Sequence, residues 1–275
     1  MQPTYQNLQW AYQLHYDVGF RTHRRRPHFA DPVRGQRLQE IMGEVCRQRG
    51  CHLLGARVYA NHVRCLLSLQ PGQDISTVME KLKAYSSREC GQQFSLVAPV
   101  WARGYFVQSV GRVNLSIVKQ YIAHQSEHHG YAARHHPPVY RYCAGSRLEL
   151  TAAHSCFELN HHVVVSTQRR ASVFDSTAGQ ALSGYWLKVA AKRGFVVDQV
   201  TIVPDHAHLL LRIPPKISIE FCVQALLNNG EHFVCNTYPQ ALAEAGIDQL
   251  WQPSAYAGTC GKVSTALVKA WLSAP

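Results

Sequence analysis

The sequence predicts an α+β protein made of two tandem domains, each an antiparallel sheet with helices on one face. Three features lead to this prediction: an internal repeat, an alternation of strand-like and helix-like segments, and enough apolar residues for two cores. Of the 275 residues, 46% are hydrophobic and 16% are charged, a composition typical of a folded rather than a disordered chain. A chain of this length can form two domains of about 130 residues.

The internal repeat consists of three ordered blocks. Residues 12–29 align with residues 157–174 at an offset of 145, and both runs read as an apolar strand that leads into an arginine-containing turn. Residues 61–71 align with residues 205–215 at an offset of 144. At an offset of 150, Trp101 aligns with Trp251, Gly111 with Gly261, and Val118-Lys119 with Val268-Lys269. Three ordered blocks with a single six-residue insertion, near Ala241–Asp248, indicate a duplication.

Each copy is expected to contain a strand, a helix, two strands, a helix, a strand and a helix, in this order. This order favours the split βαβ, or ferredoxin-like, arrangement of an antiparallel sheet covered by helices. The expected helices are residues 31–49, 75–92, 112–129, 176–193, 218–236 and 262–273. We place the first copy at residues 1–130 and the second copy at residues 156–275. Residues 131–155 contain Pro137-Pro138 and little periodicity, so a surface linker is expected there.

Positive charge is concentrated in the first copy. The formal net charge is +11, and residues 1–150 contain 19 lysines and arginines against nine acidic residues, whereas residues 151–275 contain nine against eight. So uneven a distribution favours an anionic partner, most often nucleic acid, over a basic surface that serves solubility alone. The candidate contacts to a DNA backbone are Arg24, Arg25, Arg26, Lys81, Lys83, Arg88 and Lys119. Trp101, Tyr105 and Phe106 are candidates for stacking on bases, although core packing is the stronger expectation for Trp101 and Phe106.

Other features bear on the cellular compartment. No apolar run approaches the roughly 18 residues of a membrane helix, and the polar start of the chain is not a signal peptide. The nine cysteines are odd in number and include no Cys-x-x-Cys pair, so reduced thiols are expected rather than a disulfide framework or a cysteine zinc site. The sequence therefore predicts a cytoplasmic protein that has no membrane partner.

Two groups of residues are candidates for a catalytic or metal-binding site. His206 and His208 alternate within an apolar run, so on a strand both imidazoles project from one face and a divalent metal between them is plausible. The alternative is a pair of partly buried sheet histidines. Tyr121 and Gln125 are separated by one helical turn and share a helix face, and the alternative for Tyr121 is an exposed tyrosine without a function.

Three adjacent histidine pairs are weaker candidates for metal binding. They are His128-His129, His135-His136 and His161-His162. Adjacent side chains diverge on a strand or helix, so we expect these histidines to be solvated instead.

In combination these motifs resemble a known family. The His–hydrophobe–His strand is accompanied by a Trp101, Gly104-Tyr105-Phe106 and Val110-Gly111 stretch, and by a helix that reads Val-Lys-x-Tyr-Ile-x-x-Gln over residues 118–125. This set is similar to the single-tyrosine HUH transposases, the small transposases of insertion sequences that move as single-stranded DNA, which include the REP-associated tyrosine transposases. The resemblance covers nearly all of residues 10–130 and, more weakly, residues 156–275.

The resemblance implies an HUH-type endonuclease and strand transferase that nicks and joins single-stranded DNA beside a hairpin, in a bacterial cytoplasm or nucleoid. In the family two histidines and a glutamine hold Mg²⁺ or Mn²⁺, which polarises the scissile phosphate. A tyrosine attacks phosphorus and forms a 5′-phosphotyrosine link. On this sequence the metal ligands correspond to His206, His208 and Gln125, and the nucleophile corresponds to Tyr121.

Neither copy carries the complete set of these residues. In the first copy the histidine pair reads His62-Val63-Arg64, and an arginine cannot coordinate a cation. In the second copy the tyrosine position is Trp271. Because family members resemble dimers that exchange the tyrosine helix, we expect a monomeric pseudo-dimer with one composite site and one degenerate site at His62, Arg64 and Trp271. The alternative is an inactive, domesticated nucleic-acid-binding protein of the same fold.

Overall fold

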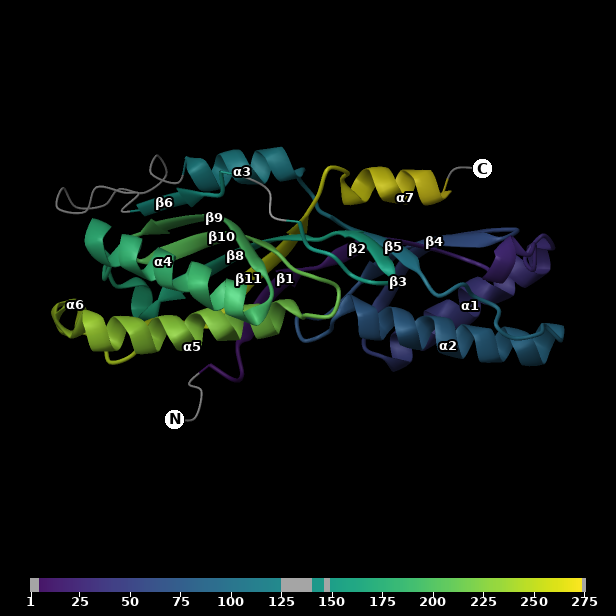
Figure 1. The fold of residues 1–275 in the computed structure, drawn as a ribbon, viewed down its shortest axis with the longest axis horizontal. Helices are drawn as coiled ribbons and strands as arrows, with labels where there is room; N and C mark the ends of the chain where they lie inside the picture. Colours follow the sequence, from purple (N-terminus) through teal and green to yellow (C-terminus); the bar gives the residue numbers. More distant parts are fainter. Residues whose placement is uncertain (1–4, 125–139, 146–148, 274–275) are drawn as a thin grey trace.

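The computed structural model describes residues 5–124, 140–145 and 149–273, and it is an elongated molecule with two sheets lying end to end (Figure 1). The first sheet has the strand order β3-β4-β2-β5-β7. Its strands are β2 (His15–Arg21), β3 (His52–Tyr59), β4 (His62–Ser68), β5 (Tyr105–Val110) and β7 (Ser155–Glu158). Two long helices cover one face, α1 (Pro32–Gln48) and α2 (Ile75–Phe94), and the side chains of Asp31 and Asp74 cap their first turns.

The second sheet repeats this plan with strand order β1-β11-β8-β10-β9-β6. Its strands are β1 (Gln9–Gln13), β6 (Tyr140–Cys143), β8 (Asn160–Thr167), β9 (Val196–Val203), β10 (His206–Arg212) and β11 (Trp251–Cys260). The long helices here are α4 (Ser176–Arg193) and α5 (Ile219–Thr237), capped by Asp175 and Ser218. The expected α+β class with two sheet domains is confirmed.

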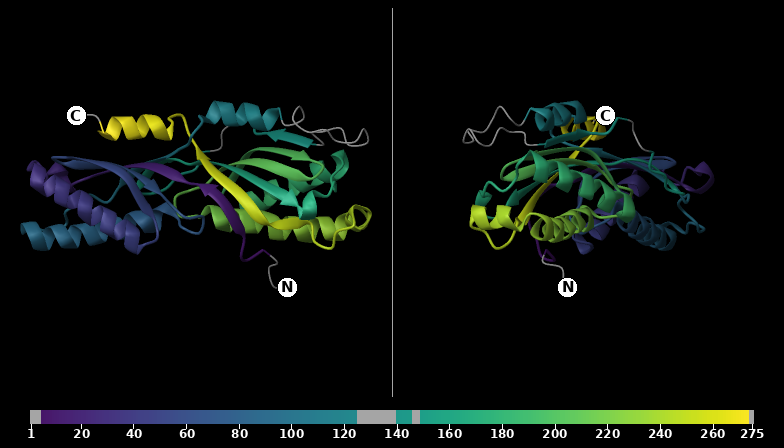
Figure 2. Two further views of the ribbon diagram at one scale, coloured as in Figure 1. Left: turned by 180° about the vertical axis from the view of Figure 1, so that it is seen from behind. Right: turned by 60° about the vertical axis from the view of Figure 1, so that its left-hand side comes forward.

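Each copy lends one short strand to the sheet of the other copy. β1 pairs in parallel with β11, and β7 pairs in parallel with β5. Within its own copy, β1 is separated from β2 by the single residue Leu14, and β7 is separated from β8 by the single residue Leu159. Figure 2 shows the purple strand β1 beside the yellow strand β11. The sequence does not predict these parallel pairs, because the two partners belong to different copies.

At the centre of the molecule the segments that follow β5 and β11 cross. The amide of Leu115 donates to the carbonyl of Gly261, and the amide of Thr265 donates to the carbonyl of Gly111, each at 2.8 Å. These four residues are two repeat-related pairs, so the crossing is symmetric. It places an approximate two-fold axis between the copies.

Only glycine fits at the two crossing points. A Cβ atom on Gly111 would lie 2.2 Å from the carbonyl oxygen of Thr259, and one on Gly261 would lie 2.0 Å from the carbonyl oxygen of Ser109. Both contacts are with backbone atoms of the other copy, which cannot rotate away. The glycines therefore permit the close approach of the two chains.

A buried pair of aligned residues meets near the same axis. The hydroxyl of Tyr16 lies 2.9 Å from Nε2 of His161, and both side chains are buried. Burial lowers the pKa of His161 to about 3 and raises the pKa of Tyr16, so both side chains are neutral at physiological pH. The expectation that the His161-His162 pair is solvated is wrong for His161, because this position faces the interface between the copies.

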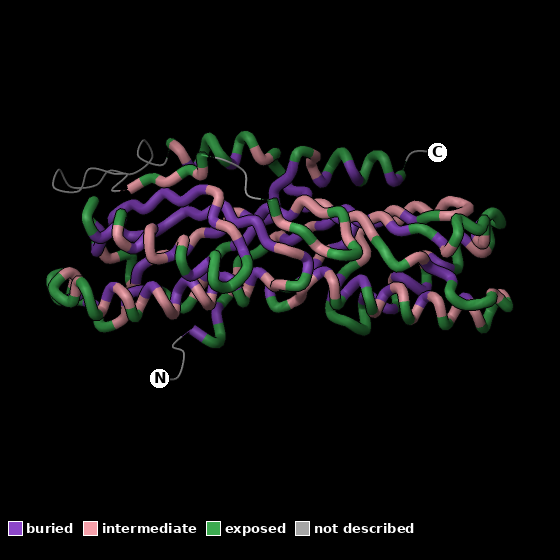
Figure 3. Tube along the Cα trace, viewed as in Figure 1, coloured by how far each residue is buried: buried purple, intermediate pink, exposed green. Residues whose placement is uncertain are grey.

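The crossing sends the last helix of each copy to the opposite sheet. These helices are α3 (Leu115–Ala123) and α7 (Thr265–Ser273). Val118 and Ile122 of α3 pack against Leu210 of the second sheet, and Leu272 of α7 packs against Leu66 of the first. Each helix lies on the sheet face opposite the two long helices (Figure 1). Figure 3 shows that the strands of the second sheet beneath α3 are largely buried, whereas both helices present an exposed outer side.

Smaller differences from the expected elements have local causes. α3 and α7 begin three residues later than expected, because the residues before them form the crossing. The six-residue insertion forms a short extra helix, α6 (Pro239–Ala245). Within the expected linker, Tyr140–Cys143 form the edge strand β6, paired antiparallel with β9. None of the described helices is long and apolar enough to cross a bilayer, and none of the nine cysteines, all of them described, forms a disulfide.

We expect Gly261→Ala to lower the free energy of unfolding by at least about 2 kcal/mol, because the new methyl group overlaps a backbone carbonyl. The control is Gly43→Ala within α1, where an added Cβ meets nothing within 4 Å. That change removes backbone freedom from the unfolded chain and is expected to stabilise by about 0.5–1 kcal/mol. Urea unfolding monitored by circular dichroism measures both, and equal effects would contradict the role of the crossing.

Candidate active site

Strand β10 presents two histidines on one face of the second sheet. His206 and His208 project toward the side that carries α3, whereas Ala207 and Leu209 point into the main core. The two imidazoles converge, with 3.1 Å between their Nε2 atoms, and both residues are buried. The alternation expected from the sequence therefore places both rings in one site.

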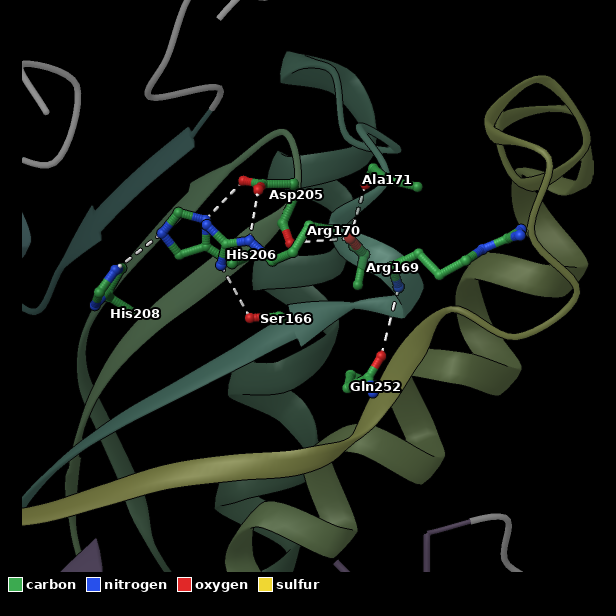
Figure 4. A network of polar contacts seen from close by, with 9 residues as sticks. Ser166, Arg169, Arg170, Ala171, Asp205, His206, His208 and Gln252 are labelled. Carbon is green, nitrogen blue, oxygen red and sulfur yellow. Dashed lines mark hydrogen bonds and ion pairs between the residues drawn. The ribbon is translucent and has the colours of Figure 1, made fainter. Parts of the chain in front are cut away.

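A carboxylate orients the first of these rings. Asp205 Oδ1 lies 2.7 Å from Nδ1 of His206, and because a carboxylate only accepts hydrogen bonds, this nitrogen is the donor. The other oxygen of Asp205 is paired with Nε of Arg170 at 2.9 Å, and Arg170 also donates to Ser166 Oγ at 3.0 Å (Figure 4). With Nδ1 donating to Asp205, the other ring nitrogen of His206, Nε2, faces His208.

A third histidine supports the second ring. Nε2 of His162 lies 3.1 Å from Nδ1 of His208, and the two rings stack with centroids 5.4 Å apart. Burial lowers the pKa of His162 to about 4, so this side chain is neutral at physiological pH and is able to accept a hydrogen bond from Nδ1 of His208. His162 is half-buried rather than solvated, which corrects the expectation for this pair.

Tyr121 reaches this histidine cluster from the first copy. Its ring lies edge-on to His208 and His162, at centroid distances of 5.5 and 6.0 Å. α3 is held in place by its apolar face and by Thr201 of β9, whose hydroxyl donates to the carbonyl of Ile122 at 2.9 Å. The Tyr121 side chain is 47% exposed, so an incoming substrate can approach it.

The expected third ligand, Gln125, lies outside the described residues, as do His128-His129 and His135-His136. Within the described part of the chain, no group of three or more His, Cys, Asp and Glu side chains is arranged to hold a metal ion. The described residues thus supply two converging imidazoles and their hydrogen-bond partners. Two neutral imidazole nitrogens are suitable ligands for a divalent transition metal.

The equivalent position in the first copy has a different chemistry. Arg64, which aligns with His208, forms two hydrogen bonds to the fully buried carboxylate of Asp17, at 2.9 and 2.5 Å. Asp17 aligns with His162 and also accepts a hydrogen bond from Gln108 at 2.7 Å. The Trp271 ring lies over the guanidinium at 4.7 Å.

His62 takes no part in this ion pair. Its ring stacks on Tyr59 with centroids 4.2 Å apart, and its Nδ1 lies 2.9 Å from Asn61 Oδ1. Where the second copy has a carboxylate, Asp205, the first copy thus has the neutral side chain of Asn61. The first copy therefore presents a buried ion pair covered by an indole in place of a histidine cluster.

The candidate DNA contacts lie in different surroundings. Arg24, Arg25 and Arg26 are exposed in the turn after β2, with left-handed φ angles of 54° at Arg24 and Arg25. Lys119 is exposed on α3, and Arg88 is exposed on α2 beside Glu89.

The remaining candidates are less accessible. Lys81 is half-buried. Lys83 donates to the backbone carbonyls of residues 102–104 at 2.5, 3.0 and 3.2 Å, and burial lowers its pKa to about 8. Trp101 is buried and stacks on Phe29 with centroids 5.4 Å apart, which confirms core packing for this residue.

Sequence reasoning missed the residues that position the histidine pair. Asp205 immediately precedes His206, and this adjacency was the available signal. Arg170 and His162 lie on or beside β8, so nothing in the linear sequence connects them with β10. Only the antiparallel register, which places His206 opposite Ser166 and His208 opposite Val164, brings them together.

The chain belongs to the family of IS200-like transposases, whose model matches residues 10–125 and again residues 155–274. It is similar to the transposase of insertion sequence element IS200 from Salmonella typhimurium, with 32% identity over 93 residues, 32% of this chain and 60% of the relative. It is also similar to the ISDra2 transposase TnpA of Deinococcus radiodurans, with 29% identity over 36% of this chain and 70% of the relative. The match to the IS200 transposase thus spans about 60% of that protein's length.

Two solved structures are also similar. One is a putative transposase from Deinococcus radiodurans, with 26% identity, a TM-score of 0.34, and coverage of 42% of this chain and 92% of the other. The second is a REP-associated tyrosine transposase bound to a REP hairpin, with 17% identity, a TM-score of 0.30, and coverage of 39% and 61%.

We expect Arg64→Ala to lower the free energy of unfolding by about 2 kcal/mol, because it leaves the Asp17 carboxylate buried without its cation. The double variant Asp17→Asn with Arg64→Ala removes the charge as well, and it is expected to recover at least half of the loss. A double-mutant cycle from urea unfolding measures the coupling between the two side chains. If the two substitutions change the free energy of unfolding additively, Arg64 does not stabilise the protein through its ion pair with Asp17.

Proposed function

We propose that this protein nicks and rejoins single-stranded DNA at one composite site, in which Tyr121 of the first copy acts with His206 and His208 of the second. The observation that carries the proposal is the 5.5 Å approach of the Tyr121 ring to His208, although the two residues lie in different copies. Membership of the IS200-like transposase family supports a DNA-processing reaction. The degenerate site is proposed to take no part in the chemistry.

In the proposed reaction the Tyr121 oxygen attacks phosphorus. A P–O bond to tyrosine forms as the bond from phosphorus to the 3′ oxygen breaks, so the strand is left with a 3′ hydroxyl and a 5′-phosphotyrosine link. The reverse attack by a 3′ hydroxyl rejoins the strand. An unperturbed phenol has a pKa of about 10, so Tyr121 must lose its proton as it attacks.

The metal proposal rests on the donor atoms of the site. His206 and His208 would hold a divalent cation through the converging Nε2 atoms, with Gln125 as the proposed third ligand. When bound, Mg²⁺ or Mn²⁺ would polarise the scissile phosphate and favour loss of the phenol proton. Imidazole ligands favour Mn²⁺ over Mg²⁺. Asp205 and His162 would fix the orientation of the two rings through their Nδ1 atoms, as outer-shell partners of metal-bound histidines commonly do.

The proposed substrate is a single strand that carries a hairpin. The exposed arginines after β2, the excess of basic residues in the first copy, and Lys119 on the same helix as Tyr121 support a polyanionic partner. The solved relative that is bound to a REP hairpin is consistent with this substrate class.

We expect Tyr121→Phe to abolish formation of the covalent DNA adduct and to change DNA affinity by no more than about threefold, because the ring is kept and only the nucleophilic oxygen is lost. The assay incubates the protein with labelled single-stranded oligonucleotides and Mn²⁺ and detects the adduct by denaturing electrophoresis. The matched control is Tyr256→Phe, a half-exposed tyrosine whose ring lies 5.8 Å from His162. An adduct on the Tyr121→Phe variant would refute the assignment. Absence of any adduct from the unaltered protein would favour a binding protein without chemistry.

Replacement of either clustered histidine is expected to remove activity. His206→Ala and His208→Ala should each lower the rate of adduct formation at least about 100-fold, whereas His62→Ala should leave it within about twofold. Rates at increasing Mn²⁺ concentration measure both the loss and any shift in metal affinity. Equal losses from His62→Ala and His206→Ala would show that both copies are catalytic.

The composite site is proposed to form within one chain, because the strands and helices that a dimer would exchange are already exchanged between the copies. A mixture of Tyr121→Phe and His206→Ala chains is therefore expected to recover no activity, and light scattering should give a monomer of 30.9 kDa. Recovery of activity to about a quarter of the normal rate would instead identify a dimer that shares its sites.

A further inference from the structure

The degenerate site of the first copy contains an open pocket of about 650 Å³. This volume lies within the range of ligand pockets. The pocket is bounded by Trp271 from α7, by Phe106 from β5, by Gly19 and Arg21 from β2, and by Cys156 from β7. Both copies thus contribute to its walls, as they do at the Tyr121 site.

Aromatic rings and an arginine form part of the pocket lining. The Arg64 guanidinium contacts two of these rings, at 4.7 Å from the Trp271 centroid and 5.8 Å from the Phe106 centroid. The bidentate contact with Asp17 fixes the plane of the guanidinium and neutralises its charge. Trp271 remains 39% exposed, so its indole offers a stacking surface for a planar, uncharged group.

One glycine keeps this space open. Gly19 lies on the same face of β2 as Asp17, and the aligned residue of the second copy is Val164. A Cβ on Gly19 would meet Phe106 and Val63 at 3.9 Å, which is ordinary contact distance. The backbone therefore tolerates a side chain here, and the glycine leaves part of the pocket open that a valine would occupy.

Arginines lie in the pocket and near it along the chain. Arg21 lines the pocket itself, and after Thr22 and His23 the chain continues into the exposed turn of Arg24, Arg25 and Arg26. Arg57 lies on the neighbouring side, where its Nη1 donates to the carbonyl of Trp271 at 3.3 Å. A pocket for a planar group beside a row of arginines is complementary to one unpaired nucleotide of a single strand, with the base inside and the phosphate at the rim.

We propose that this pocket binds an unpaired nucleobase of single-stranded DNA without reacting with it, so that the degenerate site serves as an anchor for the strand. The choice of DNA as ligand rests on the proposed function. Arg64, at the position aligned with His208, and Trp271, at the position aligned with Tyr121, then serve binding in place of catalysis. The indole of Trp271 supplies the stacking surface in place of the nucleophile.

The test measures binding apart from chemistry. A fluorescent oligothymidylate of about 15 nucleotides is titrated by anisotropy without added divalent metal, so that covalent capture at Tyr121 does not contribute. Gly19→Val places in the pocket the side chain that the other copy carries at this position, and it should weaken binding about tenfold. Trp271→Ala removes a wall and should also weaken binding, which keeps the test decisive if the valine variant does not fold. Leu267→Ala, on the exposed side of α7, is the control and should have no effect.

An abasic strand of the same length separates base binding from backbone binding. Its affinity should be lower and should not change with Gly19→Val, because it has no base for the pocket. If Gly19→Val and Trp271→Ala both bind the oligothymidylate within about twofold of the unaltered protein, the anchor proposal is overturned. An equal loss for the abasic strand overturns it as well.

Adduct formation with Mn²⁺ at saturating DNA reports separately on the proposed function, and it should be unchanged by the control substitution Leu267→Ala. Base-dependent binding without any adduct would leave the pocket standing and refute the catalytic proposal. If an adduct forms but neither Gly19→Val nor Trp271→Ala changes DNA binding, the catalytic proposal stands and the pocket proposal is refuted.

Discussion

The architecture depends on the close crossing of two backbone segments at Gly111 and Gly261. Each segment passes so near the other copy that a methyl group would lie about 2 Å from a backbone oxygen. The crossing directs α3 onto the second sheet and α7 onto the first, and it places Tyr121 beside His208. Without it each helix would return to its own copy, and no histidine pair would meet a tyrosine.

The two sites show how one scaffold supports two chemistries. In the second copy the rings of His162 and His208 stack and share a hydrogen bond, and in the first copy Asp17 and Arg64 form an ion pair at the same two positions. An arginine alone would leave an unpaired charge beside the sheet core, so the change at one position requires the change at the other. The ion pair is internally satisfied and cannot bind a cation. The histidine cluster, by contrast, presents nitrogen lone pairs.

Sequence patterns predicted the regular elements well because each depends on local spacing. All six expected helices are present, although α3 and α7 begin three residues later than expected, and the alternation in His-Ala-His placed both imidazoles on one face of β10. The contacts that orient those imidazoles were not predictable, because Arg170 reaches Asp205, and His162 reaches His208, across an antiparallel pair of strands. The register between two strands is set by how the faces of the sheet pack. The sequence of one strand therefore does not specify which residues of the next strand lie opposite it.

The sequence by itself determined the duplication, the two sheet domains with their long helices, and the complementary loss of a histidine in one copy and a tyrosine in the other. Aligned residues alone carry this information. Only the folded structure shows that Asp17 compensates Arg64 and that Gly19 leaves space in a pocket beside Trp271. These outcomes depend on how closely two backbones approach and how side chains from distant strands pack. Both are properties of the folded chain, because they arise only when segments far apart in sequence share one interior.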